Sequence, residues 1–418
     1  MHERDALDEK RTAFRREEKR YQLHRDQTFL TRRNKKVGGP LVTRRTSLAD
    51  ALDSRDLRAV AAAGGGEHGV RAVALQTASD GVEFRNSTPN GTAPREAYEL
   101  ASRPGCVVFP GALDVATQRK WLADAVTRLC EPPAATNHDA AHGAIRGLWA
   151  AATSPEPRWL KSSSETESRD RWSSSPPPST NGRDPRDAKT SASSLLRRLR
   201  WATLGPPYDW TTRTYRTDAA AFSAVPEDIA ARCETLAAFA VESETASGNR
   251  AERSPRSERS KATAKGATTD EKDADDRQKE KEKGCPKFRF GAGLVNYYRE
   301  GDALAGHVDD AERDLSKPII SFSLGSPCVF LLGGDTRDAK PTPLILRSGD
   351  AVALVREARR RFHGVPRVFT AAENARDNKG ELLAAPRELS DPECWIEQPD
   401  VARYVAGARV NVSVRDIE

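Results

Sequence analysis

Hydrophobic and polar residues alternate most regularly near the end of the chain, in the run Arg409-Val-Asn-Val-Ser-Val-Arg415. Successive side chains of an extended strand point to opposite faces, so the three valines share one face. Arg409, Asn411, Ser413 and Arg415 share the other face. The pattern predicts a half-buried strand with an apolar side against a core and a polar side available for chemistry.

The last third of the chain predicts further strands, because short apolar runs are separated there by turn residues such as Gly333-Gly334-Asp335. These runs are 294–298, 319–324, 329–332, 344–346 and 351–354, followed by the alternating run at 409–414. Many short strands without intervening helices favour a sandwich or jelly roll. Apolar residues at helical spacing predict two packed helices, over 115–129 and 226–241, and a short strand at 105–110 precedes the first of them.

Composition divides the chain into folded and unfolded parts. Charged residues make up 31% of the 418 residues and aromatic residues only 6%, so long disordered segments are expected. Residues 1–95 are predicted to be a charged, disordered arm and linker, and residues 150–195 and 243–285 to be disordered insertions. The folded part is predicted to be a mainly β, α+β domain. It comprises residues 96–149 with a strand and a helix, a lid-like segment with a helix at 196–242, and the core at 286–418.

Net charge and cysteine usage indicate the kind of partner and the cellular compartment. The net charge of +6 fits an anionic partner such as nucleic acid, and six cysteines without a C-x-x-C pair favour reduced thiols. No apolar run reaches the length of a membrane span, so no membrane partner is expected. The N-terminal residues are too rich in acids for a transit peptide. A monomer in the nucleus or cytoplasm is expected, with organellar import left open.

Three residues form a candidate metal site. His307 and Asp309 are two positions apart, so both side chains leave one face of an extended segment. His363 follows a strand-rich stretch and is a third candidate. Two histidines and one carboxylate form the facial triad of non-haem Fe(II) oxygenases, which leaves coordination positions open. The alternative is that H-x-D arose by chance and that His363 is an ordinary loop histidine.

The two arginines of the alternating run suggest a second binding function. Arg409 and Arg415 lie roughly 20 Å apart in a straight strand, so each suits one end of a dianionic ligand. Arginine binds carboxylates in a bidentate manner. The alternative is an edge strand with two solvated arginines.

The order N-x-Y, H-x-D, H and R-x-N-x-x-x-R resembles the AlkB family of Fe(II)/2-oxoglutarate-dependent dioxygenases. The segments GLVNYYREGDALAGHVDD, RRRFHGVPRV, PGCVVFPGAL and RWATLGPPYDWTTRTY look most like its eukaryotic homologue 1 group. The resemblance implies a double-stranded β-helix in which His307, Asp309 and His363 ligate Fe(II). It further implies that the co-substrates are 2-oxoglutarate and O2, and that the residues around 2-oxoglutarate are Asn296, Tyr298, Arg409, Asn411 and Arg415. Arg409 would bind the distal carboxylate, Arg415 would lie near the chelating end, and Asn411 would order the site.

Aromatic and basic residues gather ahead of the core. Arg200, Trp201, Tyr208 and Trp210 are candidates for substrate binding, because aromatic rings stack on bases and arginines bind phosphates. The alternative is that Trp201 and Tyr208 pack in the core. Together with the resemblance, this segment predicts oxidative demethylation of alkylated bases in transfer RNA or DNA. Three alternatives stay open: a protein hydroxylase or demethylase, a lyase acting at abasic sites, and a binding protein with a vestigial iron site.

Overall fold

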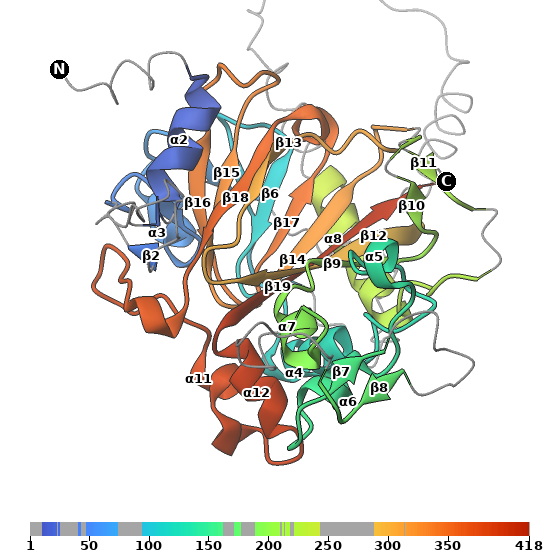
Figure 1. Ribbon diagram of the computed structural model, residues 1–418. Coiled ribbons are helices and arrows are strands. Elements are labelled where there is room, and N and C mark those ends of the chain that lie inside the picture. Colours follow the sequence, from blue (N-terminus) through green and yellow to red (C-terminus); the bar gives the residue numbers. More distant parts are fainter. Residues whose placement is uncertain are drawn as a thin grey trace, which may run out of the picture.

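The computed structural model describes residues 11–22, 24–25, 41–42, 47–73, 94–161, 171–176, 189–209, 211–212, 214–217, 221–242, 288–312 and 314–417. Two facing sheets form its centre (Figure 1). In spatial order, the eight strands of the large sheet are β4 (Val70–Ala72), β5 (Tyr98–Leu100), β6 (Cys106–Phe109), β17 (Ala351–Leu354), β14 (Ile319–Gly325), β19 (Ala408–Asp416), β12 (Phe290–Arg299) and β9 (Trp201–Leu204). The five strands of the small sheet are β13 (Leu304–His307), β18 (His363–Val368), β15 (Cys328–Leu332), β16 (Thr342–Leu346) and β3 (Leu52–Asp53).

The predicted jelly roll with packed helices is confirmed. Strand β17 has the bounds that the sequence predicts, and the other five predicted strands of the core are longer in the structure. Strands β13 and β18, which carry the two histidines, were not predicted. Both contain glycine, and β18 also contains proline, so neither gives a clear apolar run or a clean alternation.

Apolar side chains form three buried clusters, one between the sheets and one on the outer face of each sheet. Between the sheets, Tyr298, Ile319, Phe330 and Leu354 belong to one buried cluster. The outer face of the large sheet, which includes the three valines of β19, packs against α4 (Val115–Thr127), α8 (Glu227–Glu242) and α12 (Pro399–Val405). No helix in the described ranges is long and apolar enough to cross a membrane.

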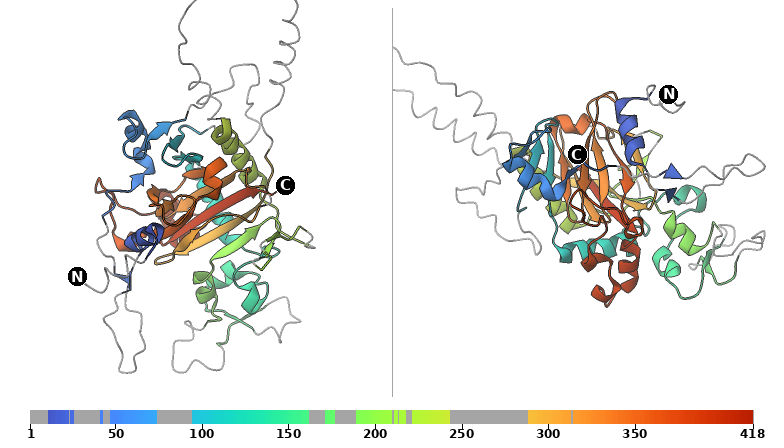
Figure 2. Two further views of the ribbon diagram at one scale, coloured as in Figure 1. Left: turned by 90° about the horizontal axis from the view of Figure 1, so that it is seen from above. Right: turned by 90° about the vertical axis from the view of Figure 1, so that its left-hand side faces the viewer.

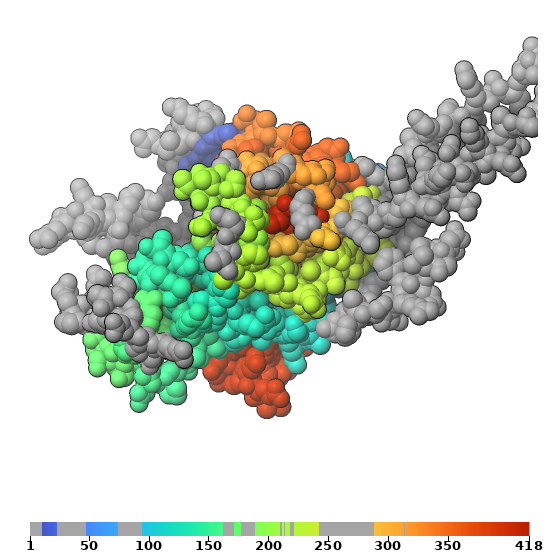
Figure 3. Space-filling view, turned by 90° about the vertical axis from the view of Figure 1, so that its right-hand side faces the viewer, coloured from blue at the N-terminus to red at the C-terminus, as the bar shows by residue number. Residues whose placement is uncertain are grey.

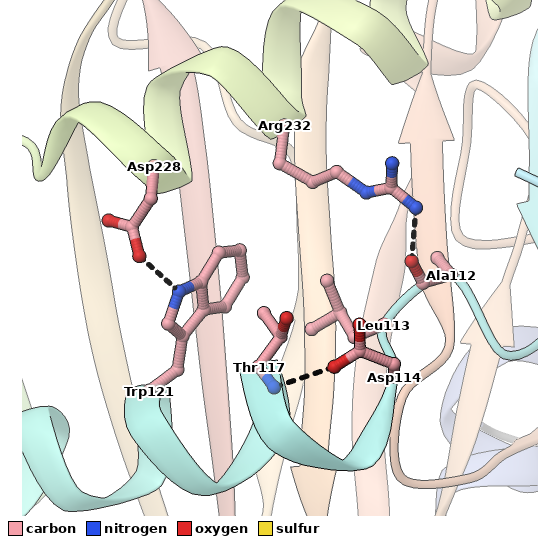
Figure 4. Close-up of a pocket in the computed structure, with 7 residues that line it drawn as sticks. All are labelled: Ala112, Leu113, Asp114, Thr117, Trp121, Asp228 and Arg232. Atoms are coloured by element: carbon pink, nitrogen blue, oxygen red, sulfur yellow. Dashed lines mark hydrogen bonds between the residues drawn. The ribbon is translucent and has the colours of Figure 1, made fainter. Parts of the chain in front are cut away.

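Helices α4 and α8 are joined by polar side chains around a small cavity (Figure 4). Trp121 Nε1 on α4 donates to Asp228 Oδ2 on α8 at 2.9 Å. Asp114 caps α4 by accepting a hydrogen bond from the Thr117 amide at 2.7 Å. The Arg232 guanidinium of α8 donates to the carbonyl of Ala112, just before α4. The cavity measures about 20 Å³, which is enough for about one water molecule. We therefore interpret it as part of the contact between the two helices and not as a binding site.

The prediction of a disordered arm over residues 1–95 is wrong for residues 11–22 and 47–73. Helix α2 (Ala13–Tyr21) packs on the outer face of the small sheet (Figures 1 and 2), and residues 47–73 contain β3, α3 (Leu57–Ala62) and β4. Phe14 and Tyr21 are fully buried although their neighbours are mostly charged. Tertiary packing of one face therefore stabilises a helix whose average composition is that of a solvated segment.

The prediction for residues 150–195 is also wrong where the structure describes them. Strands β7 (Trp159–Leu160) and β8 (Trp172–Ser173) and the helices α6 (Leu148–Ala152) and α7 (Ala192–Arg197) lie below the sheets in Figure 1. Residues 162–170, 177–188 and 243–287 lie outside the described residues, and the predicted insertion at 243–285 falls among them. A last short helix, α11 (Arg387–Ser390), lies near α12 and α4.

Candidate active site

The two histidines are cross-strand neighbours. Strands β13 and β18 pair antiparallel, with His307 directly opposite His363, and the ring centroids are 4.4 Å apart. Asp309 follows β13 and lies between them: its Oδ1 is 3.7 Å from His307 Nε2 and its Oδ2 is 3.6 Å from His363 Nε2. One donor atom from each of the three residues lies within 4.8 Å of the others. The structure therefore brings the predicted triad together.

Both imidazoles are oriented in the same way. His307 Nδ1 lies 2.9 Å from the carbonyl of Ala305, and His363 Nδ1 lies 3.1 Å from the carbonyl of Arg361. Each carbonyl belongs to the residue two positions earlier, and it fixes the ring so that Nε2 faces Asp309. Such partners orient metal-binding histidines and favour the tautomer with a free Nε2.

The charge states suit a metal. Burial and the neighbouring His363 imidazole lower the pKa of His307, which favours the neutral form that binds metals. Burial alone would raise the pKa of Asp309, but the Arg415 guanidinium holds it well below its usual range. Two imidazoles beside one carboxylate match the donor set that suits Fe(II) in facial-triad oxygenases.

Arg415 lies in a buried network behind Asp309. Its Nη2 is 3.4 Å from Asp309 Oδ2, and its Nη1 donates to Glu312 Oε1 at 3.1 Å. The Glu312 carboxylate also accepts from Arg359 Nη2 at 2.8 Å and from the Tyr215 hydroxyl at 3.3 Å. Arg359 further donates to the Asp309 carbonyl at 3.0 Å. One carboxylate thus joins two arginines, a tyrosine and the segment that carries a triad residue.

The other predicted residues for 2-oxoglutarate meet on the facing strands. On β12 and β19, Asn296 pairs with Asn411 and Tyr298 pairs with Arg409. Asn411 Nδ2 donates at 2.8 Å both to Ser321 Oγ and to the Phe322 carbonyl, which fixes its amide. The Arg409 guanidinium lies over the Tyr298 ring, 5.1 Å from its centroid, and burial raises the pKa of Tyr298 to about 12.

A cavity of about 550 Å³ connects these groups. It is lined by the triad, by Asn296, Tyr298, Arg409, Asn411 and Arg415, and by Trp201, Tyr208 and Tyr215 from the segment ahead of the core. On the molecular surface, residues of the C-terminal strand (dark red) are visible between orange residues of the core and bright green residues of that segment (Figure 3). The polar face predicted for β19 therefore belongs to a cavity between the sheets.

Of the four predicted substrate-binding residues, two line the cavity. Trp201 at the start of β9 and Tyr208 on β10 (Tyr208–Asp209) are half-buried and line the cavity. Arg200 does not line it; the structure places its guanidinium 3.0 Å from Asp302, in an ion pair. Trp210 lies outside the described residues.

Three residues of the site were not assigned from the sequence. Tyr215 on β11 (Thr214–Tyr215) pairs with Tyr208, and the ring centroids are 5.3 Å apart. Glu312 and Arg359 form the buried pair described above. The aromatic cluster around 195–215 contained a signal for Tyr215. The loose run of acids after Asp309 gave no reason to choose Glu312 over its neighbours.

Comparisons with known proteins decide the family. Residues 155–415 match the family described as the 2OG-Fe(II) oxygenase superfamily. The chain belongs to this superfamily. It is 31% identical over 411 residues to the DNA N(6)-methyladenine demethylase ALKBH1A of Arabidopsis thaliana, covering 98% of this chain and 97% of that protein. It is 28% identical over 367 residues to the nucleic acid dioxygenase ALKBH1 of Homo sapiens, covering 85% and 76%. The solved structure of OsALKBH1 matches with a TM-score of 0.38 at 18% identity, covering 75% of this chain and 97% of that chain.

The similarity to ALKBH1 proteins confirms the predicted resemblance to AlkB-type dioxygenases, and membership of the superfamily confirms the predicted cofactors. 2OG-Fe(II) oxygenases use Fe(II), 2-oxoglutarate and O2, and the cavity fits the first two. Its triad offers the donor set for iron. Arg409 Nε and Nη1 are buried with no hydrogen-bond partner among the described residues. Unmet charged donors of this kind are what a carboxylate of 2-oxoglutarate would satisfy.

Proposed function

We propose that this oxygenase removes alkyl groups from bases in nucleic acid, either transfer RNA or DNA, with release of succinate, CO2 and formaldehyde. The observation that carries the proposal is the cavity itself, which joins the triad to the half-buried aromatic residues Trp201, Tyr208 and Tyr215. Aromatic side chains stack on a base that has left its helix. Relatives named as demethylases of DNA N(6)-methyladenine and of transfer RNA support the same substrate class.

The position of each side chain in the cavity indicates its role. His307, Asp309 and His363 would hold Fe(II), which together with 2-oxoglutarate and O2 supplies oxidation of an unreactive C–H bond. Arg409 would bind the distal carboxylate of 2-oxoglutarate, beside Tyr298. Arg415 holds Asp309 ionised. Asn296 and Asn411 line the cavity beside Arg409, and the aromatic residues would cover a bound base and exclude water.

Two other activities predict different outcomes. A protein hydroxylase or demethylase on the same core would oxidise a peptide and leave oligonucleotides unchanged. A lyase acting at abasic sites would use a lysine amine and would persist without the metal ligands. None of the described residues that line the cavity is a lysine, which makes the lyase the weaker alternative at this site. A nuclear or cytoplasmic location and a monomeric state stay predictions.

The test is anaerobic loading with Fe(II) and 2-oxoglutarate, followed by addition of O2 and one substrate at a time. The substrates are transfer RNA and RNA or DNA oligonucleotides bearing N1-methyladenine or N6-methyladenine, a methylated histone-type peptide, and an abasic oligonucleotide. Mass spectrometry measures succinate and the modified base or residue. Asp309→Ala is the control, since it removes one ligand of the triad.

We expect methyl groups to be lost from nucleic acid by the wild type and retained with Asp309→Ala. Succinate formation coupled only to the peptide would overturn the nucleic-acid assignment and keep the oxygenase. Cleavage of the abasic strand that persists in His307→Ala would support a separate lyase. Absence of succinate with every substrate, in a protein that demonstrably holds iron, would refute the proposed reaction.

A further inference from the structure

Helix α2 packs against the backs of both strands that carry the histidines. The Phe14 ring lies so close to Gly306 on β13 that a Cβ built there would come within 2.4 Å of it. The same ring lies against Gly333, and its centroid is 6.3 Å from that of Phe362, the residue before His363. The two glycines therefore make room for a side chain from the N-terminal part of the chain, far in sequence from the triad.

A buried carboxylate on α2 binds the backbone beside His307. Glu18 is 1% exposed; its Oε1 accepts a hydrogen bond from the Gly306 amide at 2.5 Å, and its Oε2 accepts from Arg15 Nη1 at 2.7 Å. The Gly306 amide belongs to the Ala305–Gly306 peptide group. The carbonyl of that same peptide group is the one that contacts His307 Nδ1 at 2.9 Å.

The three groups form one line from a carboxylate, through a peptide, to an imidazole. Hydrogen bonds in series polarise one another, so a carboxylate on the N–H side makes the carbonyl oxygen a stronger acceptor. Many metal-binding histidines donate directly to a carboxylate, which fixes the ring and raises its basicity as a ligand. Here the peptide group stands between the carboxylate and the ring and would transmit the same effect.

A second contact fixes the next peptide group. Arg337 Nη2 donates to the Gly306 carbonyl at 2.7 Å, and its guanidinium lies 4.9 Å from the centroid of the Phe362 ring. The Arg337 carbonyl in turn accepts from the Phe14 amide at 2.9 Å. Helix α2 therefore contacts the Gly306 amide directly, through Glu18, and the Gly306 carbonyl indirectly, through Arg337.

We propose that Glu18 is a positioning residue of the metal centre, which orients His307 through the Ala305–Gly306 peptide. The inference rests on the proposed role of His307 as a metal ligand. Glu18 contacts neither the metal nor the substrate and acts only through His307. Its removal should therefore weaken metal binding and leave the 2-oxoglutarate residues on β12 and β19 unchanged. Replacing partners of this kind typically reduces metal affinity or activity by about 10–100-fold.

The test uses the full chain and Co(II) alone as the probe. Calorimetric titration measures cobalt affinity, and visible absorption at saturating cobalt reports the ligand geometry. Glu18→Leu removes the acceptor at similar volume, and Glu18→Gln keeps an acceptor oxygen. Glu17→Leu is the matched control, because Glu17 lies on the same helix and pairs with Arg20. His307→Ala establishes that cobalt binds at the triad, and 2-oxoglutarate affinity is measured at saturating cobalt.

We expect about tenfold weaker cobalt binding and an altered spectrum for Glu18→Leu. For Glu18→Gln and Glu17→Leu we expect values within about threefold of the wild type, with 2-oxoglutarate affinity unchanged in all three. If Glu18→Leu does not fold, Glu18→Ala is tested against Glu17→Ala, with the same expectation. A folded Glu18 variant without the acceptor that binds cobalt as the wild type does, with the same spectrum, would overturn the proposal. Unchanged cobalt binding by His307→Ala would instead refute the triad itself.

Discussion

Replacing Arg409 with methionine should move stability and ligand affinity in opposite directions. Arg409 is 2% exposed, and its Nη2 donates to Ser323 Oγ at 3.1 Å. Its Nε and Nη1 have no acceptor among the described residues. A buried donor without an acceptor costs about 1–3 kcal/mol. The contact of the guanidinium with the Tyr298 ring offsets part of that cost by about 0.5–2 kcal/mol.

The two effects can be sized separately. Methionine fills much of the same volume and removes the unmet donors, so the free energy of unfolding of the ligand-free variant should rise by about 1 kcal/mol. Hydrogen bonds to a charged group contribute about 1.5–3 kcal/mol each. Loss of two of them should weaken 2-oxoglutarate binding by roughly 3–6 kcal/mol, which is about two to four orders of magnitude.

Two assays measure these quantities on the same preparations. Urea unfolding without ligand gives the stability, and anaerobic calorimetry of the cobalt-loaded protein gives the affinity for 2-oxoglutarate. Arg409→Lys keeps the charge and loses the two-pronged geometry, so its affinity should lie between the other two. Arg403→Met is the control for loss of an arginine, because the Arg403 side chain is 62% exposed on α12.

Either of two results would refute the reasoning. If Arg409→Met bound 2-oxoglutarate as tightly as the wild type, Arg409 would not hold the distal carboxylate. If the ligand-free variant were less stable by several kcal/mol, the Arg409 guanidinium would stabilise the fold, and its donors would already be hydrogen-bonded without 2-oxoglutarate.

Three further predictions concern the surroundings of the site. Tyr215→Phe loses the hydroxyl that contacts Glu312 and Arg415, so steady-state kinetics should show KM for an oligonucleotide raised about fivefold with KM for 2-oxoglutarate unchanged. Glu312→Ala leaves Arg359 buried without its carboxylate and should lower the unfolding free energy in urea by about 3 kcal/mol, with a smaller loss for Glu312→Gln. Burial raises the pKa of Asp350 to about 6, above the value of about 3.9 in an unfolded chain. Ionisation therefore costs the folded state, and the stability of the wild type relative to Asp350→Asn should fall as pH rises from about 4 to about 6; a difference that does not change with pH would contradict this.

The parts of the site on regular alternating strands could be predicted from the sequence. The run 409–415 specified its own two faces, and the structure places its valines against helices and its polar residues in the cavity. The cross-strand pairs of Asn296 with Asn411 and of Tyr298 with Arg409 could not be predicted from periodicity. Register between strands more than 100 residues apart is set by the whole sheet.

Helix α2 shows why other contacts were missed. Its sequence between Phe14 and Tyr21 consists only of charged residues, and composition alone predicts a solvated segment for it. Two aromatic residues seven positions apart were the only apolar signal for a packed face. The burial of a glutamate such as Glu18 cannot be predicted from the sequence, because its hydrogen-bond partners become neighbours only in the folded chain.

The position of β19 has a consequence for the order in which the protein can assemble. It comes after every other described strand in the sequence, yet it lies inside the large sheet, where it pairs with β14 on one side and β12 on the other. During synthesis on the ribosome, the strands on its two sides therefore have no shared partner until residues 408–416 emerge. The earlier strands then have unpaired edges until β19 arrives, so we expect slow folding and exposure to aggregation while the chain is being made.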